Sequence, residues 1–338
     1  MADRISLKQL ARELGLSEST VSKALNGRRD VSAEVRERVR ELADALGYAP
    51  DPAARGLATG KRGAIGVYLL NRFGRPAGEY FGFNFLGGLM KEAQMRGNDL
   101  MVFQESDEAA RDGYLHYARK RGVDGVVFVG MWPNDPLCAG LSDDVFPWVS
   151  IDTPIPGAAR GFVSTDNRRG IRDMLEEICA RGCRRIGYIG IHGGGYVGTE
   201  RRAAFEDFCV ERGLLDKTLM IDTALNMRAG YNAAMELLGG GKTGTVSGRE
   251  RPEAIVCASD LQALGCLRAA RDLGLSVPDD LGVAGFDDIP AASLSSPALT
   301  TAAQHADAIG RQAIASLLGE PNPEPVLIPA RIVLRESL

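Results

Sequence analysis

The fold of the N-terminal part is decided by the segment LKQLARELGLSESTVSKALNG, residues 7–27. Leu7 and Leu10 begin a run of apolar residues at helical spacing, which predicts a short amphipathic helix. Gly15 can end that helix in a left-handed conformation, and Ser17 is a suitable N-cap for the next one. The segment therefore predicts two short helices joined by a tight turn.

A third helix is expected from about residue 32 to residue 46, where apolar residues again recur at helical spacing. Three such helices form the helix-turn-helix unit, which places its second helix in the major groove of DNA. The polar side chains that this helix would present are Glu18, Ser19, Thr20, Ser22, Lys23 and Asn26. Lys23 can donate to guanine acceptors, and the hydroxyls can bind phosphates. The same pattern also fits a plain three-helix bundle with a solvated face.

The first 62 residues closely resemble the headpiece and hinge of the LacI family of bacterial transcription repressors. The resemblance covers the segment quoted above, residues 31–50, and the stretch DPAARGLATG at 51–60. In that family the hinge becomes helical on operator DNA, and a leucine that matches Leu57 wedges into the minor groove. The resemblance extends the expected DNA contacts to Ser6, Leu7, Ser17, Ser32, Tyr48, Ala54 and Leu57.

The hinge-like stretch departs from the family at two positions. Asp51 stands where the family usually has Asn, and a carboxylate near phosphates opposes DNA binding. Gly56 weakens a helix by about 1 kcal/mol relative to Ala. We therefore expect the hinge helix to form less readily in this chain than in the family generally.

Charge is distributed unevenly along the 338 residues, whose net charge is −4. Residues 1–62 hold 12 basic and 9 acidic side chains, whereas the remainder holds 28 and 35. A small basic head on an acidic body favours a polyanionic partner for the head, although an excess of 3 charges is modest. The charge balance alone therefore decides little.

Composition and targeting signals restrict the class of protein. The chain is 45% hydrophobic and 25% charged, which excludes a disordered or fibrous protein. It has no apolar run of the roughly 18 residues that a membrane span needs, and no apolar signal core follows Met1. We therefore expect a cytoplasmic protein without a membrane partner.

The cysteines are expected to be reduced thiols. Six cysteines are scattered through the chain, which does not suit a disulfide framework. Cys179 and Cys183 are four residues apart on an expected helix and could share a metal, but none of the three histidines lies near them in sequence. No metal site and no cofactor are expected.

After residue 62, short apolar runs alternate with helical stretches. The expected strands lie at 64–70, 100–103, 125–129, 148–151, 185–189, 219–221, 254–258 and 282–286. Such alternation predicts parallel sheets with helical crossovers, and there are enough strands for two lobes. The fold class is therefore α/β, with a helix-turn-helix head, a hinge and a two-lobed core.

The family resemblance implies a core like that of the periplasmic binding proteins, with three crossings between lobes and a sugar-sized ligand between them. We expect a DNA-binding head at 1–50, a hinge helix at 51–62 and an effector-binding, dimerising core at 63–338. The crossings are placed near 163, 291 and 323. Lobe 1 would then comprise about 63–162 and 292–322, and lobe 2 about 163–291 and 323–338.

Polar residues follow several expected strands, at the edge where open parallel sheets bind ligands. Carboxylates and a guanidinium suit vicinal hydroxyls, which both donate and accept hydrogen bonds. By resemblance, Arg201 matches a ligand-clamping arginine, Asp287 a sugar-binding aspartate and Asp152 another ligand-contacting aspartate. Ser259 matches a position that is often Asn, whereas Asp260 is interpreted as the N-cap of the next helix.

Aromatic residues near strand ends are candidates for stacking on the C–H face of a sugar. Trp132 follows the strand at 125–129, and Phe286 immediately precedes Asp287. The long loop at 71–81 ends in Phe81 and departs from the compact form usual in the family, which favours an oligosaccharide as much as a monosaccharide.

Rival functions remain open from the sequence. The loop GGGYVG at 193–198 matches the dinucleotide-binding pattern G-x-G-x-x-G, and Asp222 follows the next expected strand. Paired carboxylates could also serve a glycoside-processing enzyme, and a purine could replace the sugar as effector. The favoured reading is a non-enzymatic, ligand-responsive repressor of carbohydrate-utilisation genes that binds a pseudo-palindromic operator as a homodimer.

Overall fold

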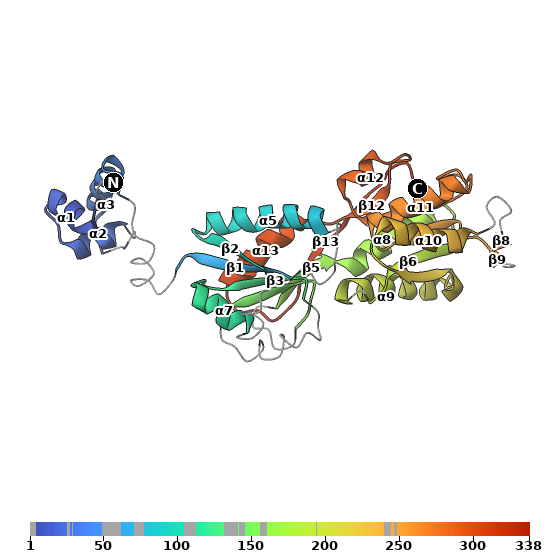
Figure 1. The fold of residues 1–338 in the computed structure, drawn as a ribbon, viewed down its shortest axis with the longest axis horizontal. Coiled ribbons are helices and arrows are strands. Elements are labelled where there is room, and N and C mark those ends of the chain that lie inside the picture. The colour runs from blue at the N-terminus through green and yellow to red at the C-terminus, as the bar shows by residue number, and fades with distance from the viewer. Residues whose placement is uncertain are drawn as a thin grey trace. The chain divides into compact units, whose positions relative to one another are not determined.

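The computed structural model describes residues 5–25, 28, 30–48, 62–70, 78–104, 113–131, 141, 146–155, 161–193, 195–239, 245–246 and 249–338. The chain divides into two compact units, Met1–Gly63 and Ala64–Leu338. Each unit has its own hydrophobic core and is described by itself (Figure 1).

The first unit contains three helices, α1 (Leu7–Leu14), α2 (Glu18–Leu25) and α3 (Ala33–Ala45). Ser6 caps α1 in a reciprocal capping box with Gln9, and Gly15 ends the helix with φ 66°. A small core joins the helices, and its fully buried members are Leu10, Val21, Ala24 and Val39. The predicted helices and turn are thus confirmed in this unit.

The second unit is built on two six-stranded sheets (Figure 1). The first sheet has the order β13-β5-β4-β3-β1-β2, and all its strands are parallel. These strands are β1 (Ala64–Leu69), β2 (Asp99–Phe103), β3 (Val126–Val129), β4 (Trp148–Ile151), β5 (Phe162–Asp166) and β13 (Val326–Pro329). Helices α5 (Gly78–Met95) and α13 (Ala306–Leu318) pack on one face of the sheet, and α7 (Tyr114–Arg121) packs on the other. This assembly is called the first lobe.

The second sheet has the order β14-β12-β11-β10-β6-β7, and only β14 runs antiparallel to its neighbour. Its strands are β6 (Ile186–Ile191), β7 (Met220–Thr223), β10 (Ala254–Cys257), β11 (Gly282–Asp287), β12 (Thr300–Ala303) and β14 (Arg331–Val333). The helices beside it are α8 (Asn167–Ala180), α9 (Gly195–Arg212), α10 (Met227–Leu238), α11 (Asp260–Asp272) and the short α12 (Pro290–Leu294). This assembly is called the second lobe. A 3₁₀ turn, η2 (Lys217–Leu219), and a short hairpin of β8 (Thr245–Val246) and β9 (Arg249–Glu250) complete the described elements.

The chain crosses between the lobes after β5, after β12 and between β13 and β14. The first crossing lies close to the predicted position near 163, but the predictions near 291 and 323 are wrong. β12 reads Thr-Thr-Ala-Ala, a weak strand signal, so the second lobe was ended too early. β13 is an edge strand of the first lobe, and nothing in its sequence indicates which of two sheets it joins.

The central strands of both sheets can be recognised in the sequence by their apolar residues. The central strands β4, β6 and β10 are buried along their whole length, because helices cover both faces of a parallel sheet. β6 and β10 therefore read as continuous apolar runs, whereas β4 includes the buried Ser150, and polar residues such as Asp152 and Ser259 follow the strands. These polar ends create the candidate site described below.

Candidate functional site

Three aspartates at strand ends have left-handed backbones. Asp152 has φ 58°, Asp287 has φ 125° and Asp288 has φ 56°, and these are the non-glycine residues with positive φ in the described ranges. Such conformations are costly for residues with a Cβ and concentrate at functional sites. Asp288 pairs with Arg335 at 2.6 Å, which ties down the C-terminal segment. Asp152 and Asp287 therefore remain as the candidates for ligand contact.

Asp152 follows β4 in the first lobe. Its Oδ1 accepts a hydrogen bond of 2.6 Å from Ser164 Oγ on β5. Burial raises the pKa of Asp152, and the negative charge of Asp287 raises it further. The Ser164 hydroxyl and the positive charge of Arg201 act in the opposite direction. The two aspartates and Arg201 are thus close enough to influence one another across the two lobes.

Arg201 lies on α9 and is only 2% exposed. Its Nε donates to Asn167 Oδ1 at 2.7 Å, and its Nη1 donates to the carbonyl oxygen of Ala258 at 2.5 Å and to Asp287 Oδ1 at 3.4 Å. The guanidinium also lies over the ring of Phe286, with Cζ 3.6 Å from the ring centroid. A buried charge needs such partners, and here they hold the guanidinium in one orientation.

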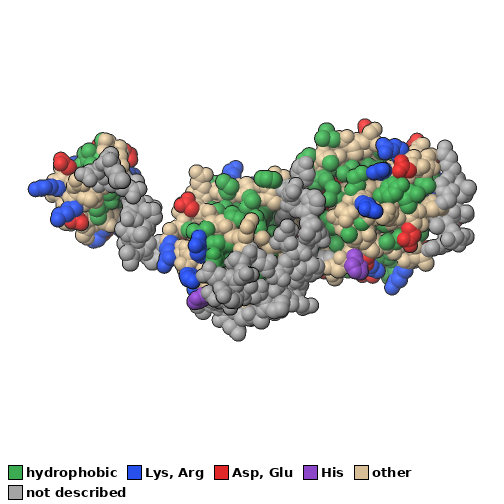
Figure 2. Space-filling view, in the orientation of Figure 1, with side chains coloured by type: hydrophobic (Ala, Val, Ile, Leu, Met, Phe, Trp, Pro, Cys, Tyr) green, Lys and Arg blue, Asp and Glu red, His purple; other side chains and the backbone are tan. Residues whose placement is uncertain are grey.

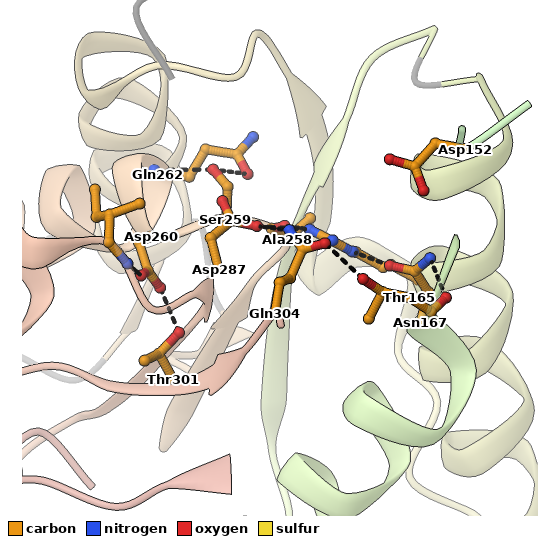
Figure 3. A network of polar contacts seen from close by, with 12 residues as sticks. Asp152, Thr165, Asn167, Ala258, Ser259, Asp260, Gln262, Asp287, Thr301 and Gln304 are labelled. Atoms are coloured by element: carbon orange, nitrogen blue, oxygen red, sulfur yellow. Dashed lines mark hydrogen bonds and ion pairs between the residues drawn. The ribbon is translucent and has the colours of Figure 1, made fainter. Parts of the chain in front are cut away.

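Asp287 ends β11 in the second lobe. Its Oδ1 accepts hydrogen bonds from Gln304 Nε2 at 2.6 Å and from Arg201 Nη1. Burial raises the pKa of Asp287, while Arg201 and Gln304 oppose that rise. Figure 3 shows the contacts running from Asp287 through Gln304 to the opposite lobe, with Asp152 on the far side.

Asp152, Arg201 and Asp287 together are called the inter-lobe site. They offer two carboxylates, at the ends of strands from different sheets, and one guanidinium from α9. Carboxylates accept from hydroxyls and the guanidinium donates to them, so the set suits a small polar ligand rich in hydroxyl groups. The structure thus brings together the three charged residues that the sequence singled out.

Ser259, predicted as a ligand contact, and Asp260, predicted as a helix N-cap, have other roles in the structure. The Ser259 side chain is fully buried and caps α11, where its Oγ accepts from the backbone N–H of Gln262 at 3.3 Å. Ser259 rather than Asp260 is therefore the N-cap. Asp260 instead accepts from Thr301 Oγ1 at 2.5 Å and from the backbone N–H of Ile289 at 2.9 Å.

The prediction that Phe286 stacks on a ligand is also wrong. Its side chain is fully buried in the core of the second lobe, because the alternation of side chains along β11 directs it toward α8 and against the face of the Arg201 guanidinium. A Cβ on Gly170 of α8 would meet its ring at 2.8 Å. Phe286 supports the arginine and has no surface left for a ligand.

Three residues of the site were missed from the sequence. Gln304 follows β12, which was not predicted, and Asn167 begins α8 immediately after the unpredicted β5. Tyr196 lies in the first turn of α9, within the glycine-rich stretch 193–198 that resembles a dinucleotide-binding motif. Asn167 and Gln304 could have been found as polar residues close behind the ends of β5 and β12, but only if those two strands had been predicted first.

Tyr196 forms an aromatic contact between the lobes. Its ring meets that of Phe162 edge-on, with centroids 5.1 Å apart and an interplanar angle of 80°. Burial raises the pKa of Tyr196 to about 12, and the negative charges of Glu200 and Asp152 contribute. The Tyr196 hydroxyl therefore belongs to the surroundings of Asp152 and adds an aromatic wall to the inter-lobe site.

Two aromatic predictions cannot be placed. Trp132 and the side chain of Phe81 lie outside the described residues. The dinucleotide motif, by contrast, is largely described: Gly195 begins α9, and Gly198 packs against Ile191. Asp222, the acidic residue that follows this motif in the rival dinucleotide-binding reading, forms an ion pair with Arg202.

The second helix of the first unit exposes the predicted DNA-binding side chains. Glu18, Ser19 and Lys23 of α2 are exposed, and Thr20 and Ser22 are partly exposed. Lys23 Nζ lies 2.7 Å from Asp30 Oδ2 in an ion pair whose two side chains are about half exposed. The hydrogen bond from Lys23, together with its charge, lowers the pKa of Asp30.

The remaining head residues have structural contacts. Ser6, Ser17 and Ser32 cap α1, α2 and α3, because each hydroxyl accepts a backbone N–H three residues later, at 3.2, 3.1 and 3.3 Å. Leu7 and Tyr48 are partly buried and pack against the small core. Asn26, Ala54 and Leu57 lie outside the described residues.

The part of the chain that the structure describes offers neither a metal site nor a membrane-spanning helix. No group of three or more His, Cys, Asp or Glu side chains there could hold a metal ion. Within the same ranges, no helix combines the length and apolar character needed to cross a bilayer.

Two protein-family models match the chain. "Bacterial regulatory proteins, lacI family" covers residues 6–51, and the "periplasmic binding protein-like domain" covers residues 175–338. The HTH-type transcriptional regulator AglR of Rhizobium meliloti (strain 1021) is 31% identical over 343 residues, which span 98% of this chain and 94% of that protein. The HTH-type transcriptional regulator CelR of Thermobifida fusca is 29% identical across 99% of this chain and 97% of its own length.

Solved structures show the same architecture. The lac repressor dimer bound to operator and the anti-inducer ONPF superposes with a TM-score of 0.75 at 22% identity, covering 99% of each chain. At that identity the likeness supports the fold alone. The complex of the transcriptional regulator CelR with cellobiose gives a TM-score of 0.68 at 25% identity, covering 99% of this chain and 100% of the other.

Proposed function

The chain belongs to the LacI family of bacterial regulatory proteins, which are ligand-responsive, DNA-binding transcription regulators and not enzymes. We propose that a sugar bound at the inter-lobe site controls its binding to operator DNA. The observation that supports a sugar is that the carboxylates of Asp152 and Asp287, one from each lobe, lie near the guanidinium of Arg201. Two carboxylates and a guanidinium satisfy vicinal hydroxyls, whereas a purine would favour stacking surfaces over paired carboxylates.

The sugar acts by favouring one arrangement of the lobes over another. Asp152 belongs to the first lobe, and Asp287 and Arg201 belong to the second, so a ligand that contacts all three has different contacts when the lobes move. That difference in affinity is the coupling free energy available to change operator binding. The regulated genes are proposed to serve carbohydrate utilisation, and the protein to act in the cytoplasm, where the operator is.

The protein is proposed to bind a pseudo-palindromic operator as a homodimer, since two identical heads read two half-sites related by a twofold axis. α5 and the edge strand β2 carry exposed large apolar side chains, which are Phe83, Met90, Met95 and Val102. Figure 2 shows apolar side chains reaching the surface over α5. Exposed apolar side chains on one helix and the neighbouring edge strand suit contact with a second copy of the chain.

A charged substitution in this patch tests the dimer. Met90→Glu is expected to give a monomer in sedimentation velocity and to weaken operator binding, because each head alone reads only half of the site. Lys91→Glu on the same helix is the control for added negative charge. If the Met90→Glu protein sediments like the wild type, Met90 is not in the dimer interface.

A thermal-shift screen tests the sugar. The purified protein is scanned with cellobiose, monosaccharides, sugar phosphates, purines and NAD(P). A ligand at about 100 times its dissociation constant should stabilise the folded state by about 2.7 kcal/mol. The shift should be lost in Asp287→Asn while the affinity of the head for DNA stays unchanged. A shift with purines or NAD(P) alone would contradict the sugar proposal.

A further inference from the structure

Five residues form a closed ring of hydrogen bonds at the inter-lobe site, made by four side chains together with the side chain and the backbone carbonyl of Thr165 (Figure 3). Arg201 donates to Asn167 at 2.7 Å and to Asp287 at 3.4 Å. Gln304 donates to Asp287 at 2.6 Å and accepts from Thr165 Oγ1 at 2.7 Å. The ring closes where Asn167 Nδ2 donates to the carbonyl oxygen of Thr165 at 2.9 Å.

The ring spans two of the three crossings between the lobes. Thr165 is on β5 of the first lobe, and Asn167 begins α8 immediately after it, at the first crossing. Gln304 lies between β12 of the second lobe and α13, which packs on the first lobe. A relative rotation of the lobes must therefore change the ring.

The direction of each hydrogen bond is determined by chemistry. The Asp287 carboxylate can only accept when ionised, so the Gln304 amide must present Nε2 to it. The Gln304 oxygen is then left to accept from the Thr165 hydroxyl, as observed. A glutamine is therefore suited to this position, because one end of its amide serves the ligand-binding carboxylate and the other serves the opposite lobe.

We propose that Gln304 is a positioning residue of the effector site, which holds the Asp287 carboxylate in place and links it through Thr165 to the first lobe. The inference rests on the proposed function in one respect: it takes Asp287 to be an effector contact. It adds a chain of hydrogen bonds through which a change in the position or ligand contacts of the Asp287 carboxylate can affect a crossing between the lobes.

Two substitutions separate the two halves of this role. Gln304→Glu replaces the donor toward Asp287 by a carboxylate oxygen but keeps an acceptor for Thr165. Thr165→Val removes only the hydroxyl, at nearly constant volume, and keeps the Gln304–Asp287 hydrogen bond. Gln312→Ala is the matched control, because Gln312 lies on α13 and bonds Ser316 Oγ on the same helix at 3.2 Å.

Amide hydrogen exchange of the full-length protein without ligand tests the ring. Thr165→Val should speed exchange at residues 162–168 by about tenfold and leave residues 286–290 unchanged. Gln304→Glu should speed exchange at 286–290, because Asp287 loses a donor and faces a second carboxylate. Gln312→Ala should change neither segment. Unchanged exchange at both segments in both ring variants would overturn the inference.

Calorimetric titration with cellobiose tests positioning of the carboxylate. Gln304→Glu should weaken cellobiose binding by about tenfold, the effect of one lost hydrogen bond to a charged group. Thr165→Val should bind within about twofold of the wild type, because the Asp287 contact survives. Equal affinities of Gln304→Glu and the wild type would reject the positioning role.

Failure of the proposed function gives a different pattern. If the wild type does not bind cellobiose, this sugar loses its support, while the exchange measurements still decide whether the ring links the two crossings. If the wild type binds cellobiose and the exchange rates of both ring variants equal those of the wild type, the sugar stands and the ring is rejected.

Discussion

Arg201 lies over the ring of Phe286, with Cζ 3.6 Å from the ring centroid, and the same guanidinium donates to the next residue, Asp287. Consecutive strand residues ordinarily point to opposite faces of a sheet. The left-handed backbone of Asp287, with φ 125°, allows both residues to contact one arginine. The end of one strand thus supplies the apolar support and the charged partner of the same guanidinium.

Replacing the aromatic support should impair ligand binding without removing a ligand contact. Phe286→Leu is expected to lower the free energy of unfolding by about 1–2 kcal/mol, through lost packing and the lost cation–π contact. It should also weaken effector binding, because the guanidinium loses its fixed plane. Urea denaturation and calorimetric titration measure the two effects. Phe205→Leu is the control, since Phe205 is buried in the same core and stacks on Tyr188. Equal losses of affinity in both variants would contradict the specific role of Phe286.

Asp152→Asn should make stability less dependent on pH. Burial raises the pKa of Asp152 in the folded chain, so the folded state keeps this proton to a higher pH than the unfolded state. The contribution of Asp152 to the free energy of unfolding therefore falls as pH rises from its ordinary value of 3.8 through the raised folded value. At pH 7 the variant should be at least as stable as the wild type.

Thermal denaturation between about pH 4 and pH 8 checks this prediction, because the difference should shrink toward the acid end, where both side chains are neutral. Asp260 and Asp287 also have raised pKa values, so the informative quantity is the variant minus the wild type. Asp99→Asn, at an exposed position of β2, is the control. A wild type that is clearly more stable than Asp152→Asn at pH 7 would be inconsistent with a net cost of the buried charge.

Asp30→Asn should strengthen DNA binding. The Asp30 carboxylate lies 2.7 Å from Lys23 Nζ. This ion pair neutralises the Lys23 ammonium, which could otherwise bind a DNA phosphate. Removing it is expected to steepen the dependence of log affinity on log salt concentration by about 1 and to raise affinity for any DNA sequence. Fluorescence anisotropy at several salt concentrations measures the slope. Glu37→Gln, on the exposed side of α3, is the control, and an Asp30→Asn slope equal to the control's would show that the ion pair is irrelevant to DNA binding.

Gly88→Ala should destabilise the first lobe. A Cβ at Gly88 would lie 2.0 Å from the backbone oxygen of Asp307, so α5 and α13 would have to separate. The expected cost is about 1–3 kcal/mol of unfolding free energy, as for other overpacked contacts. At the neighbouring Gly87 a Cβ would meet nothing within 4 Å, so Gly87→Ala should stabilise α5 by up to about 1 kcal/mol. Urea denaturation of the two variants should therefore give shifts of opposite sign.

Local signals predicted the head and most of the sheet strands. Ser6 and Gly15 bound a short apolar periodicity, and both residues act in the structure as helix ends. Buried strands such as β6 and β10 were found because a parallel sheet covered on both faces requires continuous apolar runs. β12 was missed because Thr-Thr-Ala-Ala is a weak strand signal, and β13 was assigned to the wrong lobe because the sequence of an edge strand does not encode its neighbour in the sheet.

Arg201, Asp152 and Asp287 were identifiable because each follows or faces a strand end and matches a family position. Their partners were not. Asn167 and Gln304 are 137 residues apart in sequence and are joined through Thr165 on one side and through Arg201 and Asp287 on the other, once the two crossings are folded. The sequence by itself determined the helix-turn-helix head, the alternation of strands and helices, and the charged residues of the site. Only the tertiary structure decided which residues surround those charges, because long-range contacts depend on sheet order and crossings, which local periodicity does not specify.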